Sequence, residues 1–276
     1  MNISTTTKFV EEKTANGIFF RKTFTATSKN TLVLIMGYGG SLRIWPATFV
    51  ERLAKKFIVV TYDNRGTGLS IIPQNPEDYT IAAMAGDVFD VVKLLGVASH
   101  HVLGYSMGSC IALRFAHDHQ ELVQSLFIMS GTAAGSLYAK PAKELSEALT
   151  NPQGKTLWEI YMNTFKLMYS PEAFELCLPT FRLMYEASKD LATRPLALAG
   201  HSHAFRNFDG TSYLANLKMP TTLLAGRNDR LMPVQNSENL AMKIAGSRLV
   251  LLDDCEHGPH IQYEDAVIEE IEKACD

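Results

Sequence analysis

Apolar and polar positions follow two recurring patterns along this chain. Short continuous apolar runs, typical of strands buried on both faces of a sheet, cover residues 31–36, 57–62, 101–103, 122–129, 221–225 and 248–252. Segments with apolar residues three or four apart, which predict helices, lie between them at 41–56, 79–95, 109–117, 237–244 and 263–275. This alternation predicts a parallel sheet with helices on both faces.

Near the N-terminus the pattern is different. Residues 8–14 and 18–24 read as two strands on either side of Asn16-Gly17. Asn-Gly is the dipeptide that favours a type I′ hairpin turn, so we expect an antiparallel pair here. With the later runs, the fold class is α/β: a mostly parallel, eight-stranded sheet flanked by helices.

The strand pattern stops at about Ala133 and returns at about residue 210. A stripe of apolar residues at helical spacing occupies this block at Trp158, Tyr161, Met162, Phe165, Met168 and Tyr169. Pro171 should end that helix, and Pro179 should kink or break the next one. We therefore divide the chain into a core domain, 1–133 and 210–276, and a helical cap, 134–209. The stripe either packs on the core or roofs a substrate pocket.

Composition narrows the class of protein. The chain has 276 residues, 46% hydrophobic and 20% charged, with a net charge of −3, which is ordinary for a soluble globular protein and argues against nucleic acid as a main partner. The polar N-terminal stretch lacks the apolar core of a signal peptide, and no apolar run is long enough to span a membrane. Four scattered cysteines suit a reducing compartment, so we expect a cytoplasmic protein of undetermined oligomeric state.

One pentapeptide carries a clear chemical signal. Gly104-Tyr105-Ser106-Met107-Gly108 follows a predicted strand and precedes a predicted helix, which is the context of a nucleophile elbow. A serine on so sharp a turn projects its hydroxyl, and only glycine leaves room two residues before and after it. The alternative interpretation is a glycine-rich turn with a capping serine.

Ser106 needs a base and an acid, which should follow other strands in the order Ser, Asp, His. Asp229 follows a late strand, and His257 follows the last one. His260 is the rival base, although its place near the closing helix favours a pocket-lining or capping role. Asp253 and Asp254 are rival acids, but they adjoin His257 too closely to reach its Nδ1 easily.

These motifs resemble the α/β-hydrolase superfamily, in its cap-bearing branch of esterases, lactonases and C–C hydrolases. The resemblance includes the Ser106 pentapeptide, the loop from Asp63 to Ser70, Gly226-Arg227-Asn228-Asp229 and Asp254-Cys255-Glu256-His257. It implies an oxyanion hole made by the backbone N–H groups of Tyr38 and Met107.

Two departures from the family pattern concern the expected site. Met36 stands where the family usually has a histidine before Gly37, which removes a side-chain brace from the oxyanion loop. Glu256 replaces the usual glycine before His257. Its carboxylate could lie near the imidazole and raise the pKa of His257, or it could point to solvent.

The resemblance implies a serine hydrolase that cleaves a small-molecule carboxylic ester or lactone with an apolar acyl part. We expect the pocket to be lined by Gly37, Tyr38, Tyr105, Trp158, Phe165 and His260. C–C hydrolysis of a diketone, or a low-turnover ligand sensor on the same fold, remain as alternatives. No cofactor is expected, and no metal, because the paired histidines lack converging carboxylates or cysteines at recognisable spacing.

Overall fold

The structure, a computed structural model, describes residues 7–24 and 30–275. Within them, one eight-stranded sheet has the order β1-β2-β4-β3-β5-β6-β7-β8. The strands are β1 Phe9–Lys13, β2 Phe19–Thr23, β3 Thr31–Ile35, β4 Ile58–Tyr62, β5 His100–Tyr105, β6 Val123–Met129, β7 Thr221–Gly226 and β8 Arg248–Leu252. β1 and β2 pair antiparallel, β2 pairs antiparallel with β4, and the other pairs are parallel. The predicted fold class is confirmed.

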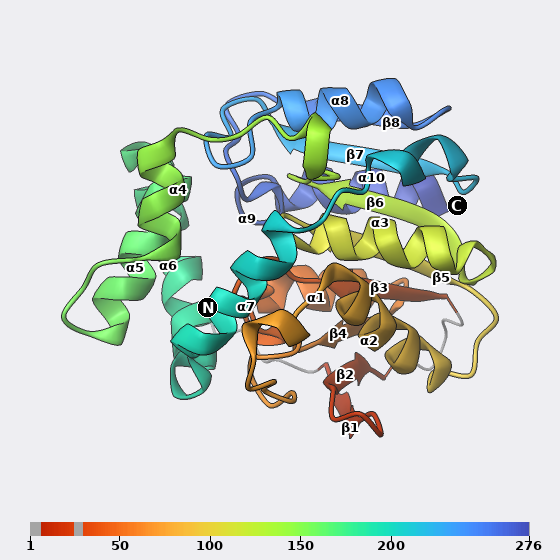
Figure 1. The fold of residues 1–276 in the computed structure, drawn as a ribbon, viewed down its shortest axis with the longest axis horizontal. Helices are drawn as coiled ribbons and strands as arrows, with labels where there is room; N and C mark the ends of the chain where they lie inside the picture. The colour runs from red at the N-terminus through yellow and green to blue at the C-terminus, as the bar shows by residue number, and fades with distance from the viewer. Residues whose placement is uncertain (1–6, 25–29, 276) are drawn as a thin grey trace.

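Helices cover both faces of the sheet (Figure 1). One face packs against α2, α3 and α8, and the other against α1 and α10. Their bounds are α1 Ala47–Leu53, α2 Ile81–Lys93, α3 Gly108–Asp118, α8 Gln235–Lys243 and α10 Glu264–Cys275, with a short α9 at Pro259–Gln262. Val33 and Ile35 of β3 face the first layer, whereas Leu32 and Leu34 face the second, as a strand buried on both sides requires.

Four further helices fill the block between β6 and β7: α4 Lys143–Thr150, α5 Leu157–Met168, α6 Pro171–Ser188 and α7 Pro195–Arg206. An isolated β-bridge between Ala134 and Asp209 joins the two ends of the block. α5 and α6 share a small apolar core of their own, built around Phe165 and Phe181. In Figure 1, α4, α5 and α6 stand beside the sheet, and α7 leads back to it. We keep the name cap for residues 134–209.

Three local expectations are wrong. Asn16 does not take the positive φ that a type I′ turn needs; Gly17, with φ +90°, does, and its N–H donates to Thr14 O at 3.0 Å. The helix predicted over 41–56 is split at Pro46, because Trp45 before the proline is extended. Of the kink or break expected at Pro179, the break is wrong, because α6 continues through Pro179 to Ser188.

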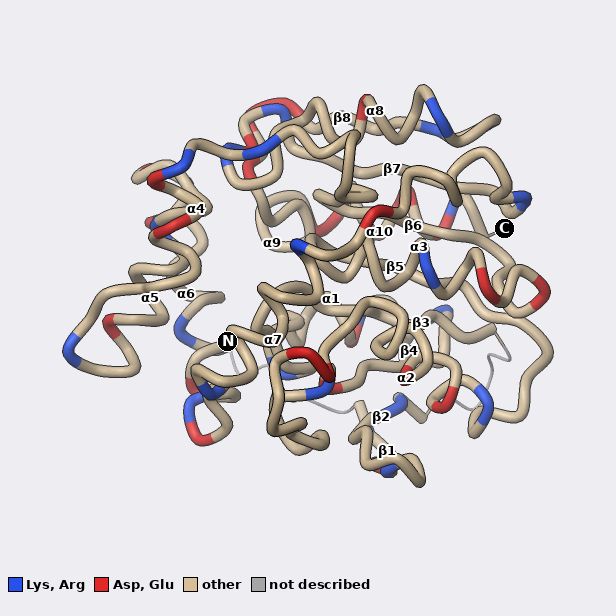
Figure 2. The backbone as a smooth tube through the Cα atoms, viewed as in Figure 1, with Lys and Arg blue, Asp and Glu red and all other residues tan. Residues whose placement is uncertain are grey.

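Charged residues of both signs are spread over the molecule (Figure 2). Of the helices that the structure describes, none has the length and apolar character needed to span a membrane.

Candidate active site

Ser106 occupies the sharp turn between β5 and α3. Its φ is +54°, in the left-handed region that costs energy for a residue with a side chain, and its N–H donates to Met129 O at 3.0 Å. A Cβ on Gly104 would lie 2.5 Å from Gly108 O, and one on Gly108 would lie 2.3 Å from Ile35 O. Neither position has room for a side chain, so the strained turn depends on both glycines.

The loops after β7 and β8 bring an acid and an imidazole to this serine. His257 Nε2 lies 3.0 Å from Ser106 Oγ, and His257 Nδ1 lies 2.8 Å from Asp229 Oδ2. The second carboxylate oxygen, Asp229 Oδ1, accepts from the N–H groups of Leu231 and Met232 at 3.0 and 2.7 Å. Both side chains of the His257–Asp229 pair are almost fully buried. A carboxylate beside Nδ1 keeps the proton there, so Nε2 is free to accept the Ser106 proton.

Two backbone amides border the serine from the other side. Tyr38 follows β3, the neighbour of β5, and Met107 is the residue before α3. Neither N–H donates a hydrogen bond to any residue of the described ranges. A Cβ on Gly37 would lie 2.9 Å from Ser106 Cβ, so the two loops are in contact. Unpaired backbone amides, here one after β3 and one at the N-terminal end of α3, are suited to hold a negatively charged oxygen.

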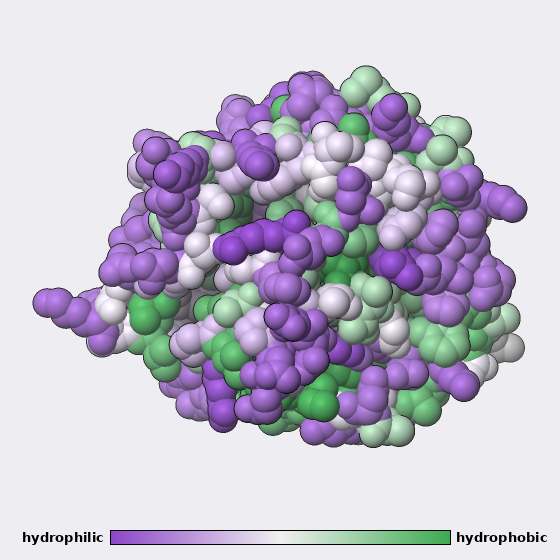
Figure 3. Space-filling model, in the orientation of Figure 1, coloured by the Kyte–Doolittle hydropathy of each residue, from purple (hydrophilic) through white to green (hydrophobic). Residues whose placement is uncertain are grey.

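A cavity of about 240 Å³ opens above Ser106 and His257, beneath the cap. Of the side chains expected to line it, those of Tyr38, Tyr105, Phe165 and His260 do so, and Gly37 contributes backbone. Further apolar groups come from the cap helices: Leu149, Leu157, Ile160, Met168 and Met184. On the face drawn in Figure 3, hydrophobic surface lies in a recess between the cap and the sheet domain, with hydrophilic surface around it.

A second cavity of about 510 Å³ shares four lining residues with the first: Tyr38, Ser106, Leu149 and Leu231. Its wall is more polar and contains Lys140, Lys143, Ser146, Glu147, Ser202 and Arg206 beside aromatic side chains. Lys143 pairs with Glu147 at 3.6 Å. Ser106 is therefore reached by an apolar cavity on one side and a mixed, partly basic one on the other.

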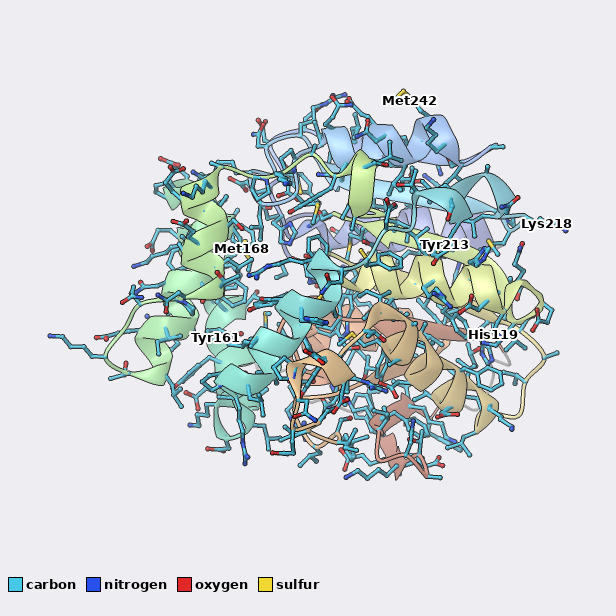
Figure 4. The ribbon with its side chains drawn as sticks, viewed as in Figure 1. His119, Tyr161, Met168, Tyr213, Lys218 and Met242 are labelled. Atoms are coloured by element: carbon cyan, nitrogen blue, oxygen red, sulfur yellow. The ribbon has the colours of Figure 1, made fainter. Side chains whose placement is uncertain are left out.

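The structure places Trp158 outside both cavities. Its indole packs against Tyr185, with ring centroids 4.9 Å apart, and carries the Arg182 guanidinium over its face. Tyr161, which the sequence analysis placed only in the helical stripe, lines the apolar cavity, and its buried hydroxyl has no hydrogen-bond partner among the described residues. Figure 4 shows Tyr161 and Met168 on α5. Helical spacing alone does not tell which of these side chains meets the cavity.

The two candidate histidines lie in different surroundings. His260 is buried among aromatic rings, 4.7 Å from Tyr105 and 5.1 Å from Trp45 between centroids. Burial, with a smaller effect of the nearby His257, lowers the pKa of His260 to about 3, so it stays neutral. Its ring contacts the cavity, but only His257 reaches both Ser106 and Asp229.

Glu256 does not point to solvent, which was one of the two positions expected for it, because it is only 4% exposed. One carboxylate oxygen accepts from Ser170 N at 3.0 Å, and the other is bonded by the Gln262 side chain. Ser170 is the residue before α6, so Glu256 joins the loop of His257 to the cap. Arg230, next to Asp229, also reaches the cap, through Tyr169 O at 3.3 Å.

No group of three or more His, Cys, Asp or Glu residues within 7–24 and 30–275 is arranged to hold a metal ion. The chemistry available at the site is that of a hydroxyl, an imidazole, a carboxylate and backbone amides.

Comparison with known proteins agrees with this geometry. Residues 30–263 match the family model of the alpha/beta hydrolase fold, and the chain belongs to that family. A relative from Pseudomonas savastanoi pv. phaseolicola, named "putative carbamate hydrolase RutD", is 31% identical over 233 residues, which are 83% of this chain and 87% of the relative.

Solved structures show the same fold over nearly the full length. A hydrolase from Pseudomonas aeruginosa is similar with a TM-score of 0.80 and 26% identity, covering 99% of both chains. An enol-lactonase from Burkholderia xenovorans is similar with a TM-score of 0.81 and 21% identity, covering 96% of this chain and 99% of that one. The relatives and the site together support a hydrolase.

Proposed function

We propose that this protein is a serine hydrolase that cleaves a small carboxylic ester or lactone through an acyl-enzyme on Ser106. The observation that carries the proposal is the continuous contact from Ser106 Oγ to His257 and on to Asp229, at 3.0 and 2.8 Å, at the floor of an apolar cavity. A serine hydroxyl is a weak nucleophile, and an adjacent oriented imidazole is what activates it.

In the first half of the reaction, Ser106 Oγ attacks the carbonyl carbon while its proton passes to His257 Nε2. The carbonyl oxygen becomes negatively charged, and the N–H groups of Tyr38 and Met107 donate to it. Asp229 stabilises the protonated imidazole through Nδ1. When the bond to the leaving oxygen breaks, His257 returns the proton to that oxygen, and the alcohol departs, or stays attached as the open chain of a lactone.

In the second half, water takes the place of the serine hydroxyl. His257 removes a proton from water as its oxygen attacks the acyl carbon, and the same two amides hold the second oxyanion. Collapse of this intermediate breaks the bond to Ser106 Oγ, which recovers its proton from His257. The acid is released, and the enzyme returns to its starting state without any cofactor.

The walls of the apolar cavity support an apolar acyl part in the substrate. A volume of about 240 Å³ suits a small group, and the lining offers mostly hydrocarbon and aromatic surface. We propose that the cap, residues 134–209, supplies this selectivity, because α4, α5 and α6 contribute much of the lining while Ser106, Asp229 and His257 come from the core.

A carbamate is the second candidate substrate. The relative from Pseudomonas savastanoi, which is named as a putative carbamate hydrolase, is matched over 87% of its own length, and a carbamate presents a carbonyl carbon that a serine can also attack. The more polar cavity beside Ser106 would accommodate its nitrogen side.

Labelling with a fluorophosphonate probe tests the mechanism apart from the substrate. We expect covalent modification of Ser106 in the native protein, and none in Ser106→Ala, which should also lose at least about 10³-fold in kcat on any substrate found. A panel of p-nitrophenyl esters, lactones and carbamates of similar size then ranks the substrate classes. Hydrolysis by Ser106→Ala within about tenfold of the native rate would refute the nucleophile assignment.

A further inference from the structure

Gly39, the residue after Tyr38, is hydrogen-bonded to the cap. Gly39 N–H donates to His201 Nδ1 at 3.0 Å, and Gly39 O accepts from the Thr193 hydroxyl at 2.7 Å. His201 lies within α7, and Thr193 lies two residues before that helix begins. Both polar groups of Gly39 are therefore held by the segment through which the cap returns to the core (Figure 1).

The His201 imidazole has one protonation state and one tautomer. It is fully buried, and burial lowers its pKa to about 4, so the ring is neutral near pH 7. Nε2 lies 2.9 Å from Arg65 O, which can only accept, so the proton is on Nε2. The lone pair on Nδ1 is then free to accept from Gly39 N–H. The imidazole thus ties the loop after β3 to the loop after β4.

The same helix also holds the Tyr38 side chain. Ser202, next to His201, donates its hydroxyl hydrogen to Tyr38 Oη at 3.1 Å, and the Tyr38 ring meets the His201 ring edge-on at 6.1 Å. Gly39 has φ +65°, and a Cβ there would lie 2.6 Å from the Leu198 side chain of α7. The loop and the helix are therefore in contact through backbone, side chain and packing.

We propose that His201 is a positioning residue for catalysis, which fixes the direction of the Tyr38 N–H toward the oxyanion. The proposal rests on the proposed serine-hydrolase function. The contacts with α7 hold the peptide group between Tyr38 and Gly39 and also the Tyr38 ring, and Thr193 holds the Gly39 carbonyl. With these groups held, the Tyr38 backbone cannot rotate freely, and this fixes the direction of the Tyr38 N–H. The sequence lacks a histidine at Met36 to brace this loop from within, and His201 braces it from the cap. The oxyanion hole is then complete only while α7 is docked.

The test compares three variants on the best ester of the panel. His201→Phe keeps a ring but loses both hydrogen bonds, whereas His201→Asn keeps an acceptor at the position of Nδ1. His203→Phe, two residues further along α7, is the matched control, because among the described residues the His203 side chain is hydrogen-bonded to Asn207 alone. The measured quantities are kcat, KM and the inhibition constant of a trifluoromethyl ketone, whose hemiketal adduct with the serine carries the oxyanion.

For His201→Phe we expect kcat to fall about 10- to 100-fold, with KM changed less than about threefold. The Tyr38 N–H would be misdirected, and its hydrogen bond matters most in the transition state, where the carbonyl oxygen becomes negatively charged. The inhibition constant of the trifluoromethyl ketone should rise by a similar factor. His201→Asn should recover most of kcat, and His203→Phe should behave as the native protein.

Several results would overturn the proposal: an unchanged kcat in His201→Phe, a loss confined to KM, or an equal loss in His203→Phe. If His201→Phe does not fold, Thr193→Val removes the second bond to Gly39 with little change in volume, and it should lower kcat and inhibitor affinity together. A native protein that neither labels with fluorophosphonate nor hydrolyses any substrate would instead refute the proposed function itself.

Discussion

His257 and His260 lie three residues apart in sequence, and their environments assign them different chemistry. His257 has a carboxylate on one nitrogen and a serine hydroxyl on the other. His260 has no carboxylate partner among the described residues, and its Nδ1 is buried without a hydrogen bond. A buried imidazole without a counter-charge resists protonation, and a general base must accept a proton in each turnover.

This difference predicts the order of damage on substitution. His257→Ala should lower kcat as severely as Ser106→Ala, by at least about 10³-fold, and Asp229→Asn should also be severe because it leaves the imidazole in the wrong tautomer. His260→Ala should cost less than about tenfold in kcat, mainly through the shape of the cavity. Steady-state kinetics on one ester decides the order. If His260→Ala is the more damaging, His260 is the base.

At the scale of elements, the cap is attached to the catalytic loops on both sides. α7 holds the loop of Tyr38 through His201 and Ser202. The junction between α5 and α6 is held by Glu256 and Arg230, the sequence neighbours of His257 and Asp229. Movement of the cap would therefore disturb the loop of Tyr38 together with the loops of His257 and Asp229.

Phe165 and Trp158 lie on the same cap helix, and only Phe165 lines the apolar cavity. Phe165→Ala should enlarge the cavity and raise the ratio of kcat/KM for an octanoate ester to that for a butyrate ester, by at least about threefold. Trp158→Ala should leave that ratio unchanged, although both variants lose stability through lost packing.

The assay uses the two p-nitrophenyl esters, with thermal unfolding as a separate readout. If Trp158→Ala changes the octanoate-to-butyrate ratio of kcat/KM as much as Phe165→Ala does, the change comes from the packing of the whole cap and not from the cavity wall at Phe165. An unchanged ratio in Phe165→Ala would show that the acyl chain does not occupy this cavity.

Elements and strand ends were predictable from the sequence, and contacts between distant elements were not. Continuous apolar runs mark doubly covered strands, and the residues after them must meet at one edge of the sheet, which is why Ser106, Asp229 and His257 could be placed. The contacts of His201 and Glu256 could not be predicted in this way. The sequence around a histidine in a helix, or around a carboxylate in a loop, does not indicate which distant residue the side chain contacts. The break expected at Pro179 does not occur: α6 continues past it, with residues on both sides of Pro179 packed in the apolar core that α5 and α6 share.

At the scale of the whole molecule, several histidines are buried in the uncharged form. His100, His201 and His260 are each at most 1% exposed. Burial lowers their pKa values to about 4, 4 and 3. In the unfolded chain each would titrate near about 6.5. Between these values the unfolded state binds protons that the folded state does not.

The free energy of unfolding should therefore fall as the pH drops below about 6.5, by up to about 1.4 kcal/mol per pH unit for each of these histidines. Burial raises the pKa values of Asp63 and Asp87, and this acts in the opposite direction. Urea unfolding between pH 5 and 7, compared between the native protein and a histidine variant, therefore measures the contribution of that histidine. His100→Gln should flatten the slope, since it removes one of them from the core, while His203→Gln, on the outer side of α7, should leave it unchanged. Equal slopes for the native protein and His100→Gln would mean that His100 already carries its proton in the folded chain.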